Sequence, residues 1–303
     1  MLDALFPYNE NGLLALNVMP GAHRWLWPTR ALLGARTTFA KKTYIEEGRP
    51  WWEWHQIALE RITTPLTIAF GEIATHNHFV LDRGGKVFNR TSPVIKLPPV
   101  SSEDDHLGLL GLLNSSVACF WLQQVCHNKG RPGAEIAGAD ERYEMRYAIN
   151  ASNVAELPLC AYRPLRLAQQ LDRLASELNA TLPSALLARR PLPDRASLNA
   201  AREHASSHRR QMYALQDELD WQCYRLYGLL PEGHAAADFE SATPPERKLG
   251  ERAFEIVLAR HIAAGDESTT WFERHGSTPI TELPAHWPAD YRAVVERRIA
   301  LIE

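Results

Sequence analysis

The chain has 303 residues, 45% of them hydrophobic and 23% charged, which is typical of a globular protein with two or three small domains and excludes overall disorder. Its net charge of −3 argues against a general polyanion-binding protein. The first residues lack the basic and apolar stretches of a secretory signal, so we expect a cytoplasmic protein.

Positive charge gathers in the N-terminal third of the sequence. Between Arg24 and Lys96 there are eleven Lys or Arg residues and six Asp or Glu residues, a local net charge of +5. A basic lobe on an acidic chain is typical of a DNA-binding surface, with a merely solvated charged surface as the alternative. The same region holds two tryptophan-rich runs, at 24–28 and 49–55, and a basic segment at 36–44.

Short strands are expected after residue 65. Four apolar or alternating runs, each broken by Gly or Pro, predict a small irregular sheet; they lie at 66–70, 78–81, 86–88 and 94–97. Gly84-Gly85, between the second run and the third, is typical of a hairpin turn.

One long apolar helix is predicted from about Glu103 to Cys126, packed across this sheet. Ser101 and Ser102 supply an N-cap, and three acidic residues follow in the first turn. The stretch approaches a membrane span in length, but Gly, Asn, Ser and Gln interrupt it, so a buried core helix is expected. We expect Phe120, in its most apolar part, to be buried and Phe120→Ala to cost about 3 to 5 kcal/mol.

The remainder of the chain is predicted to be mainly helical. Apolar residues recur every three or four positions at 167–178 and again at 201–219, which predicts two helices. The Pro-rich segment 183–194 between them is expected to be a loop, so the two helices should form an antiparallel hairpin that acts as a spacer. Further helices are expected near 246–264 and at 289–302.

Four segments, in this order, carry a resemblance to a known family: Tyr44–His55, Thr75–Lys86, Ser92–Pro98 and Leu109–Gln124. They resemble the target-recognition region of PglX-type adenine-specific DNA methyltransferases of BREX phage-defence systems, which are related to type IIG restriction-modification enzymes. Residues 249–258 and 275–284 resemble a later region of that family, so the resemblance covers nearly the whole chain. With the predicted elements it implies an α+β fold: a small mixed α/β target-recognition domain at 1–162, a coiled-coil-like helical hairpin at 163–231 and a mainly helical region at 232–303.

Two motifs that such a methyltransferase needs are missing from this sequence. One is a Gly-rich turn that receives S-adenosylmethionine, and the other is an Asn/Asp-Pro-Pro-Tyr/Phe loop that holds the adenine amino group. The only Pro-Pro pairs, Pro98-Pro99 and Pro244-Pro245, lack the flanking residues of that loop. The chain therefore resembles the DNA-reading part of the enzyme, detached from its catalytic domain.

The resemblance implies S-adenosylmethionine as the cofactor of the complete enzyme and no cofactor or catalytic residues in this chain. Alone, the chain is expected neither to bind S-adenosylmethionine nor to methylate DNA. The expected partners are double-stranded DNA, a methyltransferase catalytic domain or subunit, and other BREX proteins, with no membrane.

Candidate DNA contacts fall into four groups. Tryptophans can stack on an extruded base or pack in a core; Arg and Lys can bind phosphate or guanine, or be solvated. His and Asn can read base edges, or form turns and caps, and a basic loop can follow the DNA backbone. In that order the candidates are Trp51 and Trp52; Arg49, Arg83, Lys86 and Arg90; His76, Asn77 and Asn89; Lys129 and Arg131.

Other chemistries are poorly supported by the sequence. The four cysteines form no C-x-x-C pair, and His76 and His78 have no third metal ligand nearby, so structural or hydrogen-bonding roles are expected for the histidines. No serine-hydrolase, zinc-protease or phosphate-cradling motif is present. The alternative function is a non-catalytic interaction scaffold that docks onto another defence-system subunit through the basic lobe.

Overall fold

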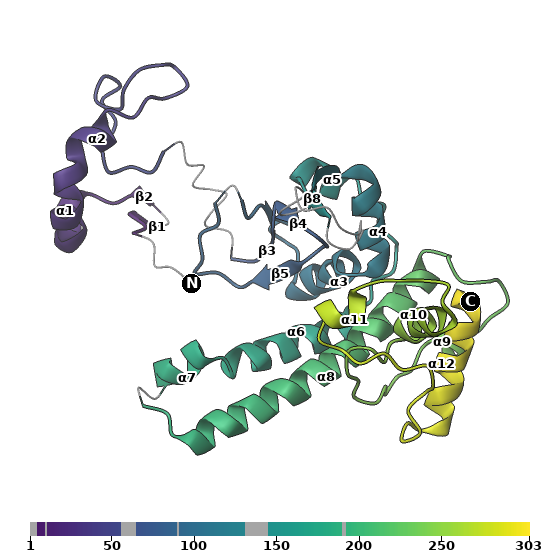
Figure 1. Cartoon of the computed structure of the whole chain (residues 1–303). Coiled ribbons are helices and arrows are strands. Elements are labelled where there is room, and N and C mark those ends of the chain that lie inside the picture. Colours follow the sequence, from purple (N-terminus) through teal and green to yellow (C-terminus); the bar gives the residue numbers. More distant parts are fainter. Residues whose placement is uncertain (1–4, 10, 56–64, 90, 131–144, 190–191) are drawn as a thin grey trace. The chain divides into compact units, whose positions relative to one another are not determined.

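The structure, a computed structural model, describes residues 5–9, 11–55, 65–89, 91–130, 145–189 and 192–303 (Figure 1). The chain divides into two compact units. The N-terminal unit contains residues 1–65 and 83–89, and the main unit contains residues 66–82 and 90–303. The mixture of helices with small antiparallel sheets confirms the α+β class.

The N-terminal unit is built from short elements around aromatic side chains. The strands β1 (Tyr8–Asn9) and β2 (Gly12–Leu13) pair antiparallel. They are followed in chain order by the 3-10 turn η1 (Leu16–Val18), the helix α1 (Pro20–Leu26), the 3-10 turn η2 (Trp27–Thr29) and the helix α2 (Arg30–Gly34). Tyr8 and Tyr44 are buried, and the Trp54 ring contacts Phe6 edge-on.

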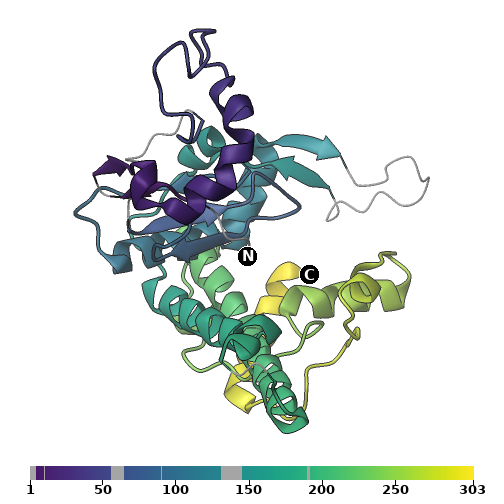
Figure 2. The ribbon, with the colours of Figure 1, turned by 90° about the vertical axis from the view of Figure 1, so that its left-hand side faces the viewer.

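The main unit begins with two three-stranded antiparallel sheets. In one, β3 (Thr67–Phe70) lies between β5 (Phe79–Asp82) and β6 (Val94–Ile95). In the other, β8 (Arg146–Ala148) lies between β4 (Ile73–Ala74) and β7 (His127–Gly130); Figure 2 shows β7 and β8 side by side. The predicted strand at 86–88 does not form: residues 83–89 lie in the N-terminal unit and are irregular.

Two helices occupy the place of the single long helix that the sequence predicts. The first, α3 (Glu103–Leu113), has the expected Ser102 N-cap, and the second, α4 (Ser116–Val125), is capped by Ser115. The break arises because Ser115 Oγ accepts a hydrogen bond from the Ala118 N–H, which competes with continuous helix. As predicted, α3 packs on β3 and β5, and the buried side chains of these elements form the largest core.

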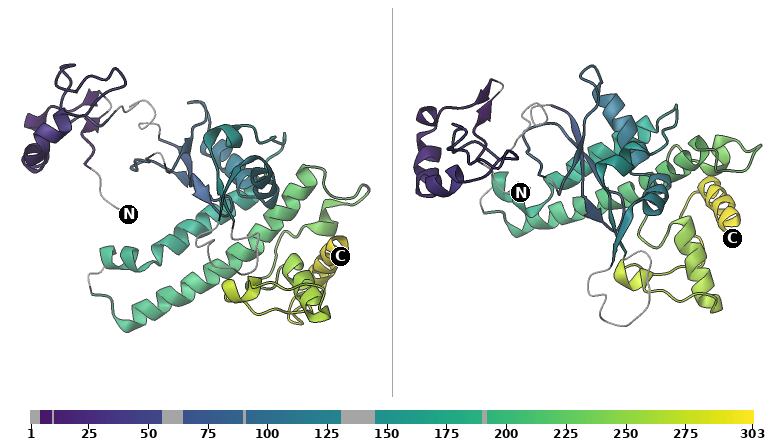
Figure 3. Two further views of the ribbon diagram at one scale, coloured as in Figure 1. Left: turned by 45° about the horizontal axis from the view of Figure 1, so that its top comes forward. Right: turned by 90° about the horizontal axis from the view of Figure 1, so that it is seen from above.

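The predicted antiparallel hairpin is present. The helix α6 (Leu165–Ala180) runs beside α8 (Arg195–Leu226) in the opposite direction (Figures 1 and 3). The intervening segment, predicted to be a loop, contains the short helix α7 (Pro183–Arg189). Proline is compatible with the first position of a helix, because its missing N–H is not needed there. At Gly111 a Cβ would lie 2.8 Å from Pro164 Cγ, so glycine allows α3 to approach α6 closely.

The C-terminal region consists of helices joined by long loops. They are α9 (Ala236–Phe239), α10 (Ala253–Ala264), α11 (Trp271–Arg274) and α12 (Ala289–Ile302), whereas the short helix α5 (Ala151–Ala155) precedes the hairpin. The predicted helix at 246–264 starts only at Ala253, because Gly250 adopts a left-handed backbone with φ of +96°. The predicted helix at 289–302 is confirmed. None of the helices in the described residues is long and apolar enough to cross a membrane.

Four buried charges hold α8 to the C-terminal region. Asp217 Oδ2 lies 2.6 Å from Arg247 Nη1 and 2.8 Å from Arg298 Nη1, and Glu218 Oε2 lies 2.6 Å from Arg298 Nη2. Desolvation opposes the charge of Asp217, but the two guanidiniums outweigh it and lower its pKa. For Glu218 desolvation dominates and raises the pKa. We call these four residues the buried charge quartet.

Candidate nucleic-acid interface

The candidate residues at 49–52 are held by contacts within the N-terminal unit. The Arg49 guanidinium pairs with the Glu53 carboxylate and lies 4.8 Å from the centre of the Tyr44 ring. The hydrogen bond to Glu53 raises the pKa of Arg49. A guanidinium engaged with a carboxylate and a ring has fewer donors left for a phosphate, so these contacts favour a structural role for Arg49.

Both candidate tryptophans are half-buried. Trp52 Nε1 donates a hydrogen bond to the Leu14 carbonyl oxygen at 3.0 Å, which satisfies its only polar atom. The Trp51 ring meets the rings of Trp27 and Trp52 edge-on, with centroids 6.2 and 5.7 Å apart. These contacts favour packing, the first of the two roles weighed for these residues, over stacking on a base.

Asn77 is engaged at the break between α3 and α4. Its Nδ2 donates to the Leu113 carbonyl oxygen at 2.6 Å and to the Ser115 carbonyl oxygen at 3.1 Å. Leu113 is the last residue of α3, so its carbonyl oxygen has no intrahelical partner and the amide caps it, whereas the Ser115 carbonyl oxygen also accepts the Cys119 N–H at 3.0 Å. These hydrogen bonds favour the capping role of Asn77 over a contact between its amide and an adenine base edge.

Asn77→Ala should therefore lower the free energy of unfolding by about 1 to 3 kcal/mol, because the Leu113 carbonyl oxygen would lose its donor and the Ser115 carbonyl oxygen one of two donors. Denaturant melts measure the loss. Asn179→Ala, at an exposed position of α6, serves as the control and should lower stability by less than about 0.5 kcal/mol. Equal stability of Asn77→Ala and wild type would refute the capping role.

His76 lies at the surface beside Asn77. Its Nδ1 is 2.9 Å from Thr75 Oγ1. Desolvation of the ring, together with nearby His78 and His275, lowers the pKa of His76. Near neutral pH the imidazole is therefore uncharged, with one donor and one acceptor nitrogen, which suits a base edge better than a phosphate. Within the described residues no three His, Cys, Asp or Glu side chains are grouped as metal ligands.

The remaining candidates that the structure describes are exposed. Arg83, Lys86 and Asn89 lie at the surface of the N-terminal unit, and Lys129 is exposed on β7 of the main unit. Arg90 and Arg131 lie outside the described residues. Arg83, Lys86, Asn89, His76 and Lys129 are thus exposed, whereas Arg49, Trp51, Trp52 and Asn77 are only partly exposed and make the packing or capping contacts described above.

One surface of the N-terminal unit was not selected from the sequence. Between Thr37 and Thr43 the chain forms a closed loop whose tip carries Phe39, Lys41 and Lys42, all exposed. We call it the Phe39 loop. The basic segment at 36–44 was the one sign of this surface in the sequence. It did not identify Phe39, because an apolar residue beside lysines can be either buried or exposed. In chemical terms, the exposed Lys and Arg side chains can bind phosphate, the Phe39 ring can stack on a base, and His76 and Asn89 can form hydrogen bonds with a base edge.

Comparison of the sequence with known proteins finds a similar protein that is named as a methyltransferase. The chain is 46% identical over 306 residues to a protein named "Adenine-specific methyltransferase PglX" from Streptomyces coelicolor; the match covers 99% of this chain and 25% of that protein. The resemblance predicted from the sequence is thereby confirmed, and the chain spans about a quarter of the length of its relative. A family model described as "Domain of unknown function (DUF7008)" matches residues 212–303. No solved structure matches the chain.

Proposed function

We propose that this chain, which matches a quarter of a PglX methyltransferase, is the DNA-recognition part of a site-specific adenine-N6 DNA methyltransferase. The 46% identity over 99% of the chain is the observation that carries the proposal. The sequence lacks the S-adenosylmethionine turn and the Asn-Pro-Pro-Tyr loop, so the chain would bind DNA while a separate catalytic domain or subunit binds the cofactor and transfers the methyl group.

The distribution of charge supports DNA as the ligand. The N-terminal unit exposes Arg83 and Lys86 together with Arg24, Arg30 and the lysines of the Phe39 loop. Lys and Arg side chains bind phosphates and release counterions, which supplies most of the affinity of non-specific DNA binding. In a BREX or restriction-modification system, such binding would direct methylation to host DNA, and other BREX proteins would be further partners.

A second candidate function is a protein-interaction scaffold, and one observation favours it. Trp25 and Leu32, on α1 and α2, are 73% and 75% exposed. Large exposed apolar side chains that lie on neighbouring elements are typical of a protein interface. A defence-system subunit would then cover this surface, and the basic residues would form its polar rim.

Salt dependence distinguishes the two functions. If Arg83 and Lys86 contact phosphates, the double variant Arg83→Ala/Lys86→Ala should bind a DNA duplex more weakly. It should also flatten the plot of log affinity against log salt by about two units in slope, close to one unit per phosphate contact. Fluorescence anisotropy with a labelled mixed-sequence duplex, titrated over a range of salt concentrations, measures both quantities.

The charge-matched control is Arg166→Ala/Arg173→Ala, which removes two exposed arginines from α6. Its salt slope should equal that of wild type. If the wild-type chain does not bind the duplex, or binds it without salt dependence, DNA recognition is excluded and the scaffold becomes the better assignment.

A further inference from the structure

The Phe39 loop presents an apolar ring to solvent and carries two exposed lysines. Phe39 is 91% exposed, and Lys41 and Lys42 beside it are exposed as well. A single exposed apolar residue is ordinary on a protein surface. This one differs because it occupies the tip of a closed loop whose sequence, Thr37-Thr-Phe-Ala-Lys-Lys-Thr43, contains no acidic residue.

Hydrogen bonds close the loop directly beneath its tip. Thr37 and Thr43 form an antiparallel bridge, and the Thr38 N–H donates to the Lys42 carbonyl oxygen at 2.9 Å. The Lys41 N–H donates to the Thr38 carbonyl oxygen at 2.9 Å, and Lys41 adopts a left-handed backbone with φ of +58°. Thr38 Oγ1 also donates to Glu47 Oε1 at 2.5 Å. The conformation of the tip is thus set by backbone hydrogen bonds within the loop and by the bond between Thr38 and Glu47.

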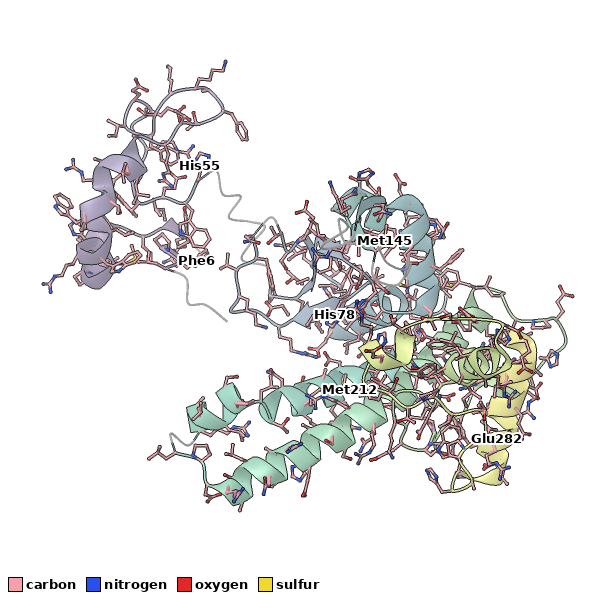
Figure 4. All side chains as sticks on the ribbon, in the orientation of Figure 1. Phe6, His55, His78, Met145, Met212 and Glu282 are labelled. Atoms are coloured by element: carbon pink, nitrogen blue, oxygen red, sulfur yellow. The ribbon has the colours of Figure 1, made fainter. Side chains whose placement is uncertain are left out.

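The residues on either side of the loop are anchored in the N-terminal unit. Tyr44 is fully buried between two guanidiniums, those of Arg36 and Arg49, at 4.4 and 4.8 Å from its ring centre. Its hydroxyl lies 3.2 Å from His55 Nδ1, a residue labelled in Figure 4. Arg36 Nη2 donates to the carbonyl oxygens of Trp51 and Glu53 at 3.0 and 2.7 Å. Because these residues anchor the loop in the folded unit, the loop would lose less conformational entropy when it binds a ligand.

We propose that Phe39 is a wedge that inserts between stacked base pairs of duplex DNA, while Lys41 and Lys42 bind the flanking phosphates. The inference rests on the proposed function and names residues for DNA contact that the sequence did not single out. Apolar side chains, Phe and Leu among them, part neighbouring base pairs in several DNA-binding proteins. Two cations on the same loop match the negative charge of the phosphates that flank a base step.

The proposal agrees with the roles of the neighbouring aromatic residues. Trp51 and Trp52 are half-buried and Trp52 has its N–H satisfied within the unit, so they would support the loop instead of entering the DNA. Unstacking a base step is also a step toward base flipping, which chemistry on adenine N6 requires. A wedge would therefore lower the cost of presenting the base to a catalytic domain.

The test uses the whole chain, a mixed-sequence duplex with 2-aminopurine at several steps, and two readouts. Phe39→Ala should weaken duplex binding about 5- to 150-fold, on the scale of one aromatic stacking contact. It should also abolish the rise in 2-aminopurine fluorescence that unstacking produces. Phe39→Leu should retain both effects in large part, since Leu also serves as a wedge. Thermal melts should show all variants folded, because the side chain is 91% exposed.

The control is Phe120→Ala on α4, which removes another exposed phenylalanine, 66% exposed, and should behave as wild type. If the wild-type chain binds the duplex and Phe39→Ala binds equally well with the same fluorescence rise, the wedge is refuted while the DNA-recognition function stands. If the wild-type chain binds no duplex, the proposed function fails and the wedge fails with it.

Discussion

Arg298→Met should lower the free energy of unfolding by about 3 to 5 kcal/mol, the usual cost of removing one partner from a buried ion pair. The Arg298 guanidinium is fully buried, bonds Asp217 and Glu218, and donates to the Phe239 carbonyl oxygen at 2.6 and 2.9 Å. Methionine fills a similar volume, so the loss would come from the missing charge and the missing hydrogen bonds. In the variant, the buried carboxylates of Asp217 and Glu218 would have Arg247 as their one cationic partner within the quartet. Denaturant melts measure the change.

Arg297→Met, at the next position on α12, is the matched control. Arg297 is exposed, and its Nε donates to the Asp238 carbonyl oxygen at 2.8 Å. Losing that bond should cost about 1 kcal/mol or less. If the two variants lose the same amount of stability, the quartet contributes no more than a surface hydrogen bond and its energetic role is disproved.

Leu122→Ala should lower the free energy of unfolding by about 2 to 5 kcal/mol, because Leu122 on α4 is only 2% exposed in the largest core. Truncation removes apolar contacts and leaves a cavity that the strands and α3 fill only partly. Phe120→Ala, two positions earlier on the same helix, should change stability by less than about 0.5 kcal/mol. The same denaturant melts measure both.

This pair of variants corrects the sequence-based expectation for Phe120, which is 66% exposed and not buried. A large loss for Phe120→Ala together with a small one for Leu122→Ala would mean that α4 presents the opposite face to the core. The error has a physical origin. Between Leu107 and Val125 most residues are apolar, so composition alone does not specify which face of a helix is buried.

Elements with a clear apolar stripe were predictable. Leu167 and Leu174 on α6, and Ala201 and Leu219 on α8, are buried as the three- and four-residue spacing indicates. The break between α3 and α4 was not predicted, because the local Ser115 cap acts together with contacts that are distant in sequence. The Asp220 carboxylate of α8 accepts the Ser116 N–H at 2.7 Å, and Asn77 caps the carbonyls. No local pattern encodes such partners.

For the candidate DNA contacts, the sequence indicates suitable residue types but not the surroundings of each side chain. The sequence places basic and aromatic residues in the same third of the chain, but it does not show which side chains are engaged within the protein. Arg49 and Asn77 have the chemistry of DNA contacts, yet their donors bond a carboxylate and backbone carbonyls. Phe39 reads as an ordinary apolar residue, and only the fold of its loop shows that it is exposed.

The buried charge quartet also determines where this chain could be cut without damage. Asp217 and Glu218 precede residue 231, whereas Arg247 and Arg298 follow it, so a truncation there would separate acids from bases. A fragment that starts at residue 212, where the family match begins, would keep all four charges but would open α8 within a helix of 32 residues. It would also strip Leu219 and Cys223 of Leu112 and Leu167, their neighbours in the core. Either fragment would expose apolar or charged surface that is buried in the whole chain. Truncations should therefore keep α3, α6 and α8 together.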